Sequence, residues 1–300
     1  MPPLSRQSSR AADAEPTDTA LTLPDSGKEL TYRSYGQSDG VPVVLLHGTP
    51  GSRLLGDLFD DAAKSHGVRL LVPDRPGYGQ SDPWPERSLS DTERIVTAVL
   101  DDAGVDSAGL IAFSGGAPHA LATATQVPER ITRLDIVAGA TPPTISESTP
   151  TLQRTLHRLA RTTPRLLAGL LRTQAWVAAR RPPAFVLQQY TTGEPTAGFS
   201  ESAAETIKAD FLEALAETPR GAVTELRNLG TPWECEYERI DLPVSLWHGR
   251  ADSNVPLTDV RRLRDTIPTA RLQILDDTDH LGTLLQATPK ALETHSDDRL

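Results

Sequence analysis

The sequence predicts an α/β protein with a mostly parallel central sheet flanked by helices. Short runs that are nearly all apolar recur along the chain, as expected of strands buried on both faces of a parallel sheet. Segments with helical periodicity lie between these runs, and this alternation is typical of one sheet covered on both sides. About 100 residues without a convincing buried strand separate residues 140 and 242. They predict a helical cap inserted between the sixth and seventh strands.

The predicted strands differ in how strongly the sequence supports them. The clearest is Val41–Leu46, which is nearly all apolar, whereas the first two are short segments on either side of the turn Pro24–Gly27. The clearest helix is Asp91–Ala103, where Ser90 and Glu93 form a capping-box pattern. The predicted strands are residues 21–23, 29–35, 41–46, 68–72, 109–113, 134–137, 243–247 and 271–275.

Three regions follow from this pattern. Residues 1–20 are rich in polar and charged side chains and are predicted to form a disordered tail. The tail lacks the apolar stretch of about 7–15 residues that a secretory signal requires, and no later stretch is apolar enough to span a bilayer. We therefore expect a soluble, cytoplasmic protein. The α/β core is predicted to comprise residues 21–144 and 242–295, and the helical cap residues 145–241.

Composition excludes several classes of function. The 300 residues carry a formal charge of −10, which argues against a nucleic-acid partner because phosphate binding requires a basic face. Cys235 is the single cysteine, so no intrachain disulfide can form. No His/Cys cluster has zinc spacing and no acidic array resembles a calcium loop. We expect neither a metal nor a cofactor, and the oligomeric state is undetermined.

Ser114 is the strongest candidate nucleophile. Apolar residues lead directly to this serine, and the small residues Ala112 and Gly116 lie two places to either side. Small side chains at these positions allow a strand to turn sharply into a helix and to expose the serine hydroxyl at the sheet edge. Ser-Gly-Gly is also common in ordinary loops, so this interpretation depends on partners elsewhere in the chain.

A serine nucleophile needs a base within hydrogen-bond reach. Among the seven histidines, His280 follows the last predicted strand on a loop at the carboxyl edge of the sheet. A loop there can bring an imidazole to the nucleophile of a neighbouring strand. His119 lies in the helix after Ser114 and is expected to face away from the hydroxyl. We assign the other histidines to surface or helix-capping positions, with His295 in the charged C-terminal tail.

The third expected partner is a carboxylate that orients the base. Asp252 follows the seventh predicted strand, on the loop next to the one that bears His280. Asp252-Ser253-Asn254 is also good turn chemistry, so a turn or helix N-cap is the alternative role. The acidic residues Asp276, Asp277 and Asp279 are too close to His280 along the chain to be its orienter.

An oxyanion needs backbone amides. The segment His47–Gly51 ends a central strand, and Pro50 disfavours helical dihedral angles at Thr49, which can direct the Thr49 amide into the site. The amide of Gly115, at the start of the helix after Ser114, supplies a second donor. An ordinary turn between a strand and a helix is the alternative interpretation of this segment.

These motifs resemble those of the α/β-hydrolase fold in order and spacing. They are His47–Gly51, Pro73–Asp82, the Ser114 turn, His248–Asp252 and Asp279-His280, and the resemblance extends from about Leu21 to Ala291. It implies Ser114 as nucleophile, Asp252 as acid, His280 as base, and Thr49 and Gly115 as oxyanion amides. It also implies a structural role for the loop Asp74–Asp82. Ala112 departs from the pattern, because many members have glycine there.

The expected activity is hydrolysis of an ester, thioester or lactone, with a small-molecule acyl compound as substrate. A serine at position 114 excludes relatives that use an aspartate nucleophile. Other chemistry of the fold stays open: acyl transfer, a lyase reaction, cofactor-free oxygenation, cyclisation, aminopeptidase activity, or binding alone.

The first part of the predicted cap is rich in arginine. Arg154, Arg158, Arg161 and Arg165 fall on one helical face. We interpret this face as the solvated side of an amphipathic helix. The alternatives are a site for an anionic substrate, a membrane surface or a partner helix.

Overall fold

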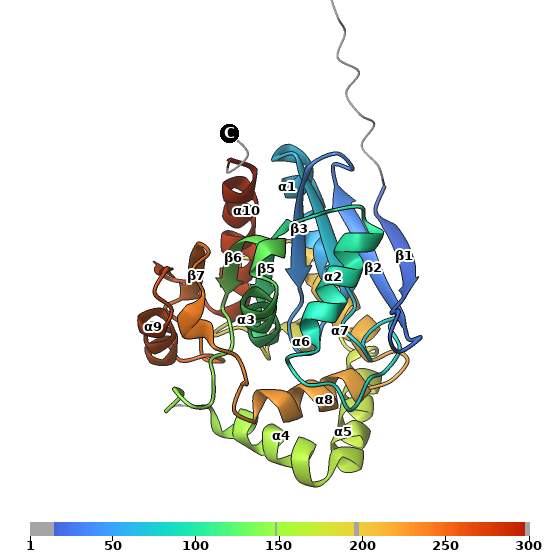
Figure 1. Cartoon of the computed structure of the whole chain (residues 1–300). Coiled ribbons are helices and arrows are strands. Elements are labelled where there is room, and N and C mark those ends of the chain that lie inside the picture. The colour runs from blue at the N-terminus through green and yellow to red at the C-terminus, as the bar shows by residue number, and fades with distance from the viewer. Residues whose placement is uncertain (1–14, 148, 195–197, 298–300) are drawn as a thin grey trace, which may run out of the picture.

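The computed structural model describes residues 15–147, 149–194 and 198–297. Its centre is an eight-stranded sheet with the order β1-β2-β4-β3-β5-β6-β7-β8 (Figure 1). β2 pairs antiparallel with β1 and β4, and the pairs from β4 through β8 are parallel. This confirms the predicted mostly parallel sheet. The strands are β1 Thr17–Thr22, β2 Glu29–Gly36, β3 Val41–Leu46, β4 Val68–Pro73, β5 Ala108–Phe113, β6 Ile131–Val137, β7 Val244–Gly249 and β8 Ala270–Leu275.

The first strand corrects the predicted tail, whose limit of residue 20 is wrong. β1 begins at Thr17 and pairs with β2 over its whole length. Its residues are largely exposed, so no apolar run marks it in the sequence. Backbone pairing and the ion pairs of Asp18 with Arg33 and Arg53 hold the strand in place. Residues 1–14 of the predicted tail lie outside the described residues.

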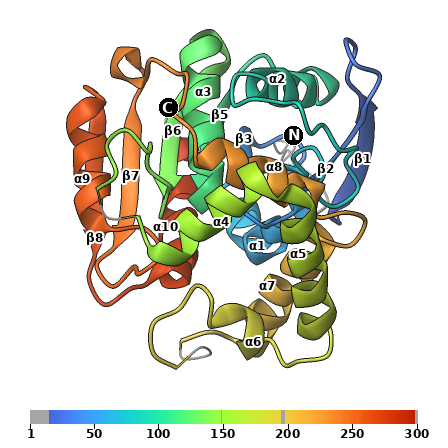
Figure 2. The same cartoon turned by 90° about the horizontal axis from the view of Figure 1, so that it is seen from below.

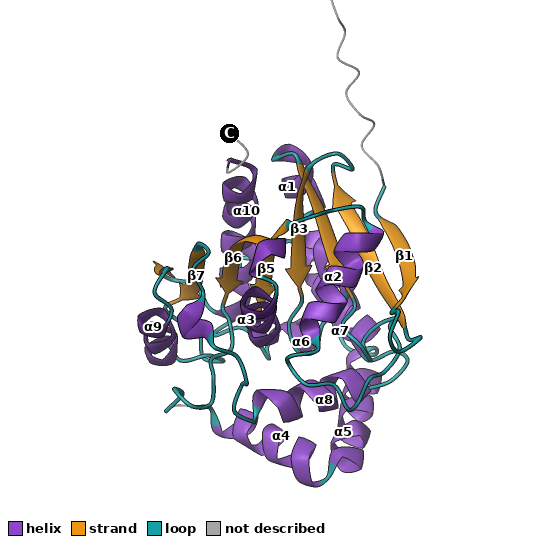
Figure 3. Ribbon diagram, viewed as in Figure 1, coloured by secondary structure: helices purple, strands orange, loops and turns teal. Residues whose placement is uncertain are grey.

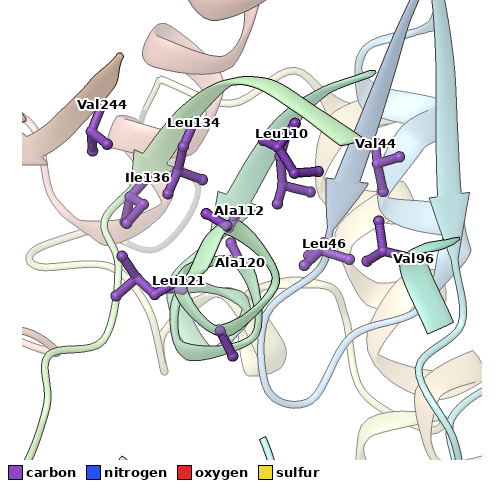
Figure 4. Packing of buried hydrophobic residues seen from close by; sticks show 14 of the residues in the cluster. Val44, Leu46, Val96, Leu110, Ala112, Ala120, Leu121, Leu134, Ile136 and Val244 are labelled. Carbon is purple, nitrogen blue, oxygen red and sulfur yellow. The ribbon is translucent and has the colours of Figure 1, made fainter. Parts of the chain in front are cut away.

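Helices cover both faces of the sheet (Figure 3). α2, α3 and α9 pack on one face through a cluster that includes Val96, Leu121 and Leu134 (Figure 4). α1 and α10 pack on the other face, where Leu45 and Leu284 are completely buried. These helices are α1 Asp60–Ser65, α2 Thr92–Asp102, α3 Ala117–Gln126, α9 Leu257–Thr266 and α10 His280–Asp297.

In the described residues, five α-helices lie between β6 and β7, and we call the stretch that carries them the helical insertion. They are α4 Thr151–Thr162, α5 Pro164–Ala178, α6 Ala184–Leu187, α7 Glu201–Ala214 and α8 Arg220–Leu229. In the described part of this stretch, no residue belongs to a strand. α4, α5 and α8 lie below the end of the sheet toward which β3 points (Figures 1 and 2). The insertion therefore lies at the carboxyl edge of the parallel strands, where α/β folds place their ligands.

Within the described residues, no helix combines the length and the apolarity that crossing a membrane requires.

Candidate active site

Ser114 follows β5 directly and adopts a left-handed backbone conformation, with φ of 49°. In this conformation the β-carbon of any residue except glycine crowds the backbone. The backbone at Ser114 is therefore strained by about 1–2 kcal/mol. The turn leaves no room at Gly116, because a β-carbon at this position would lie 2.6 Å from the carbonyl oxygen of Leu46. Ala112 is completely buried and fits beneath the turn. The small residues around Ser114 thus serve the close approach that the sequence suggests.

His280 lies beside Ser114. Its Nε2 is 2.9 Å from Ser114 Oγ, and its Nδ1 is 2.7 Å from Asp252 Oδ2. The structure differs from the predicted loop position, since His280 is the first residue of α10. The preceding Asp279 accepts a hydrogen bond from the amide of Gly282 within the first turn of this helix. The helix start therefore fixes the backbone that carries the imidazole.

Asp252 uses its two carboxylate oxygens differently. Oδ1 accepts hydrogen bonds from the amides of Asn254 at 2.8 Å and Val255 at 3.0 Å, while Oδ2 faces His280. The turn role and the role as a partner of histidine are therefore compatible. Burial acts to raise the pKa of Asp252, but the neighbouring His280 and the hydrogen bond to it outweigh burial and hold this pKa below its usual value. An ionised carboxylate can only accept, so the hydrogen bond to Asp252 requires a proton on His280 Nδ1.

Two aromatic rings lie next to the imidazole of His280. The ring of Phe113 lies 4.9 Å from that of His280, and the ring of Tyr190 stacks on it at 6.3 Å with an interplanar angle of 18°. Tyr190 comes from the segment after α6, so the insertion contributes directly to the surroundings of His280.

Thr49 and Gly115 lie side by side, as the sequence suggests. A β-carbon built on Gly115 would lie 3.2 Å from the Thr49 amide nitrogen and closer still to the Thr49 side chain. Glycine at 115 therefore allows the loop after β3 to approach the turn after β5. This proximity places two backbone amides near Ser114, as an oxyanion hole requires.

A buried carboxylate of the insertion holds the Thr49 loop. Thr49 Oγ1 donates to Glu225 Oε2 at 2.7 Å, and Arg75 binds both oxygens of Glu225. The same guanidinium donates to the backbone carbonyl oxygens of His47 and Gly48. One arginine thus connects α8 with the two residues that precede Thr49.

Further polar side chains complete this group, which we call the Glu225 cluster. Tyr78 and Arg87 each donate to Glu225 at 2.8 Å, and His119 Nε2 lies 3.3 Å away. Burial acts to raise the pKa of Glu225, but the Arg75 charge and hydrogen bonds hold it well below its usual value. Burial lowers the pKa of His119 to about 4, so this histidine is neutral at pH 7.

The family resemblance implies a structural role for the Asp74–Asp82 loop, but no sequence motif points to Glu225. Arg75 and Tyr78 of this loop do pack beneath the Thr49 loop. Glu225 lies 150 residues from Arg75 in a helix of ordinary composition, so no local pattern marks it.

The surface or helix-capping positions assigned to the other histidines are wrong for four of them. His47, His119, His248 and His295 are buried, and each lies against a polar partner inside the fold. His295 is part of α10 and lies 3.2 Å from Asp135 on β6, so it is not in a charged tail.

A cavity of about 940 Å³ connects Ser114 with the insertion. Core residues Thr49 and Gly115 line one part of it, and α4, α5 and α8 line another. A second, much smaller chamber of about 20 Å³ lies next to Ser114 and is bordered by Asp210 of α7. Asp210 accepts hydrogen bonds from the Ser52 amide and hydroxyl, and the sequence analysis did not identify it. Among the described residues, no cluster of His, Cys, Asp and Glu could hold a metal ion.

Comparison with known proteins gives matches over most of the chain. A family profile described as alpha/beta hydrolase fold matches residues 41–286. A non-heme chloroperoxidase of Kitasatospora aureofaciens is 27% identical over 85% of this chain and 89% of its own length. A 2-hydroxy-6-oxononadienedioate/2-hydroxy-6-oxononatrienedioate hydrolase of Paraburkholderia phymatum is 36% identical, but over only 42% of this chain and 46% of its own length.

Solved structures share the fold. A bromoperoxidase from Bacillus anthracis superposes with a TM-score of 0.74 at 19% identity, covering 94% of this chain and all of that one (100%). Several curated relatives match over less than half of their own length, including an uncharacterised hydrolase of Bacillus subtilis at 41%.

Proposed function

This chain belongs to the α/β-hydrolase fold family, and we propose that it is a serine hydrolase that cleaves an ester, thioester or lactone. One observation carries the proposal: Ser114, His280 and Asp252 form a continuous hydrogen-bonded chain, with distances of 2.9 and 2.7 Å. A nucleophile, a base and an orienting carboxylate in this order are the requirements for acyl transfer to serine.

In the first half of the reaction, Ser114 Oγ attacks the acyl carbon and its proton passes to His280 Nε2. Asp252 holds the imidazolium through Nδ1 and offsets its charge. The amides of Thr49 and Gly115 stabilise the oxyanion, a contribution of about 3–4 kcal/mol for one donor. The tetrahedral intermediate collapses, and the leaving alkoxide or thiolate takes the proton from Nε2.

The second half regenerates the enzyme. His280 Nε2 removes a proton from a water molecule, which attacks the acyl group on Ser114. The same amides hold the second oxyanion, and Ser114 regains its proton as the carboxylic acid leaves. The chain's own residues supply each step, and the cavity of about 940 Å³ has the size typical of small-molecule sites.

Replacement of Ser114 tests the proposal. With Ser114→Ala, turnover of a chromogenic short-chain ester should fall by at least about 10³-fold, and labelling by a fluorophosphonate probe should disappear. Ser90→Ala is the matched control, because Ser90 is exposed and should keep both signals. Full activity of the Ser114→Ala protein would show that the proposed mechanism is wrong.

The alternative is transfer of the acyl group to an alcohol or amine. The observation that favours acyl transfer is the size of the cavity, because a cavity of about 940 Å³ has room for a second substrate beside the acyl group. Product analysis with and without an added acceptor separates the two reactions: hydrolysis yields only the free acid, whereas transfer yields a new ester or amide.

A further inference from the structure

Charge is unevenly distributed along the chain. Between Glu147 and Glu194 the sequence contains seven arginines and no acidic residue or lysine. The whole chain carries −10, so the remainder carries −17. The arginines are Arg154, Arg158, Arg161, Arg165, Arg172, Arg180 and Arg181. A basic region of this kind on an acidic protein indicates attraction to an anionic partner.

The large apolar side chains that are most exposed lie in the same region. In the described part of the chain, the exposed large hydrophobic residues are Leu152 at 71%, Leu166 at 56%, Leu170 at 50% and Trp176 at 59%. All four belong to α4 or α5. Exposed leucines occur singly on many proteins, but their restriction to two consecutive helices indicates an interaction surface.

The two kinds of side chain share the outer face of α5. Leu167 and Leu171 are buried toward the molecule, whereas Leu166, Leu170 and Arg172 are exposed. α4 and α5 form an outer layer of the insertion when the molecule is viewed from below (Figure 2). We call the exposed residues of these two helices the α4–α5 face.

The seven arginines, which lie on α4 and α5 or just after α5, are available to an external partner. Across residues 15–147, 149–194 and 198–297, no ion pair with an acidic side chain involves any of the seven. Arg180 instead forms a cation–π contact with Trp176. Its guanidinium lies over the indole ring, 4.1 Å from the ring centre.

We propose that the α4–α5 face docks on an anionic lipid surface. Helices that lie in a lipid interface combine leucine and tryptophan, which enter the acyl boundary, with arginine, which binds headgroup phosphates. The acidic remainder of the protein does not prevent docking, because at physiological salt the Debye length of about 8 Å screens charges on the far side.

The cavity gives docking a consequence. Leu152, Arg154 and Arg158 are exposed and also line the cavity that reaches Ser114. Docking by this face therefore brings the cavity mouth to the lipid surface, from which an apolar substrate could enter. By contrast, Leu166, Leu170 and Trp176 are outside the cavity lining and project outward. This favours insertion into a headgroup layer over recognition of one acidic protein.

Vesicle binding of the full-length protein tests the proposal. We expect it to float with vesicles of phosphatidylcholine and phosphatidylglycerol but not with phosphatidylcholine alone, and binding should weaken in 0.5 M salt. Trp176 should enter the lipid, so the tryptophan fluorescence of the protein should shift to shorter wavelength on binding. This shift should be smaller in the Trp176→Phe protein. The Ser114→Ala protein should bind equally, which separates docking from the proposed catalysis.

Two paired variants lie outside the cavity. Arg165→Glu/Arg172→Glu should weaken binding to anionic vesicles by at least about tenfold, since each basic residue near an anionic surface contributes substantially. Leu166→Ser/Leu170→Ser should reduce binding even at low salt. Arg261→Glu/Arg271→Glu, with the same charge change at exposed positions of α9 and β8, is the control and should bind normally. These three double variants should hydrolyse a soluble short-chain ester as the parent does.

Three results would overturn the proposal. One is the absence of flotation with anionic vesicles, and another is equal flotation of the α5 and control variants. The third is an interaction that the α5 substitutions abolish while vesicle binding is absent. That interaction would be either binding to soluble polyglutamate or self-association measured by light scattering. That result would assign the face to an acidic protein or to a second copy of the chain.

Discussion

The two carboxylate oxygens of Asp252 have different partners: one stabilises a turn, and the other faces His280. Oδ1 is held by two backbone amides of its own turn, so Oδ2 is oriented toward His280 before any substrate binds. The turn therefore fixes the angle of the imidazole as well as its own backbone. Without that anchor, the carboxylate could rotate and the base would lose its preferred tautomer.

Asp252→Asn tests this orientation. Asparagine can still accept from Asn254 and Val255 through its carbonyl oxygen, but its amide group would donate toward His280 and favour the tautomer with a proton on Nε2. That tautomer cannot take the proton of Ser114, so we expect kcat for a chromogenic ester to fall by about 10⁴-fold. Asp276→Asn, at an exposed position paired with Arg250, should be unchanged. Retention of more than a tenth of the activity in Asp252→Asn would contradict the assignment.

Asp210 links the site to pH. Burial raises the pKa of Asp210 to about 7, and the nearby Asp74 adds to this rise while the Ser52 hydrogen bonds oppose it. The folded state therefore holds this proton more tightly than the unfolded chain, where an aspartate has a pKa of about 3.9. The stability contributed by Asp210 is complete below about pH 4 and is lost as the pH rises to about 7.

Asp210→Asn should remove the loss of stability that accompanies ionisation of Asp210. The carbonyl oxygen of the asparagine can keep both Ser52 hydrogen bonds, and the asparagine side chain does not ionise. We expect the variant to gain stability relative to the parent between pH 4 and pH 8, by at most about 4 kcal/mol from the roughly three-unit shift. Urea unfolding at a series of pH values measures this difference. Asp106→Asn, at an exposed position, should give parallel curves, and a parallel curve for Asp210→Asn would refute the prediction.

At the scale of elements, the Glu225 cluster joins segments that are distant in the sequence. α8 supplies the carboxylate, the loop after β4 supplies Arg75, and the loop after β3 supplies Thr49. Each charged group is buried, so each depends on the others to compensate for lost hydration. The insertion is therefore coupled to the loop that carries one proposed oxyanion amide.

Glu225→Gln should damage both stability and catalysis. It leaves Arg75 and Arg87 without a negative partner in the interior, a change that costs about 3–5 kcal/mol. The free energy of unfolding should fall by that amount, and kcat should fall more than KM rises, because the Thr49 amide loses its support. Glu217→Gln, at an exposed position after α7, is the control.

Thr49→Val separates the two effects. It removes only the hydroxyl that donates to Glu225 and keeps the amide. We expect a decrease in kcat with a loss of stability of only about 1–3 kcal/mol. Unchanged kcat in both Glu225→Gln and Thr49→Val would show that the cluster has a purely structural role.

At the scale of the whole molecule, the core and the insertion together line the large cavity at Ser114. Ser114 and its partners come from the core, while Tyr190, Phe211 and Leu226 of the insertion supply much of the apolar lining. Substrate size should therefore depend on the insertion, while the chemistry depends on the core.

Leu226→Trp tests this division. The larger ring should fill part of the chamber, so the ratio of activity on a ten-carbon acyl ester to that on the acetyl ester should fall by at least about tenfold. The kcat for the acetyl ester should stay within about threefold of the parent value. Ala216→Trp, at an exposed position after α7, should leave the chain-length profile unchanged. An equal loss on all esters would place Leu226 in the structural core instead.

Much of the architecture could be predicted because parallel strands buried on both faces are almost wholly apolar, as in Val41–Leu46 and Gly109–Phe113. The same pattern misplaces the first strand at residues 21–23, because β1 (Thr17–Thr22) is largely exposed and is held by pairing with β2. It also placed His295 in a tail, because a buried histidine paired with Asp135 has no local signature.

By itself, the sequence determined the strand–helix order, the small residues around Ser114, and the positions of Ser114, Asp252 and His280 next to strand ends. These features are local, since they follow from hydrophobic period and from backbone sterics within a few residues. Only the tertiary structure decided which distant side chains meet: Glu225 with Arg75, and Asp210 with Ser52. Such contacts depend on packing among elements that are far apart in the chain. A buried charged group needs a partner, and that partner is brought to it only when the chain folds.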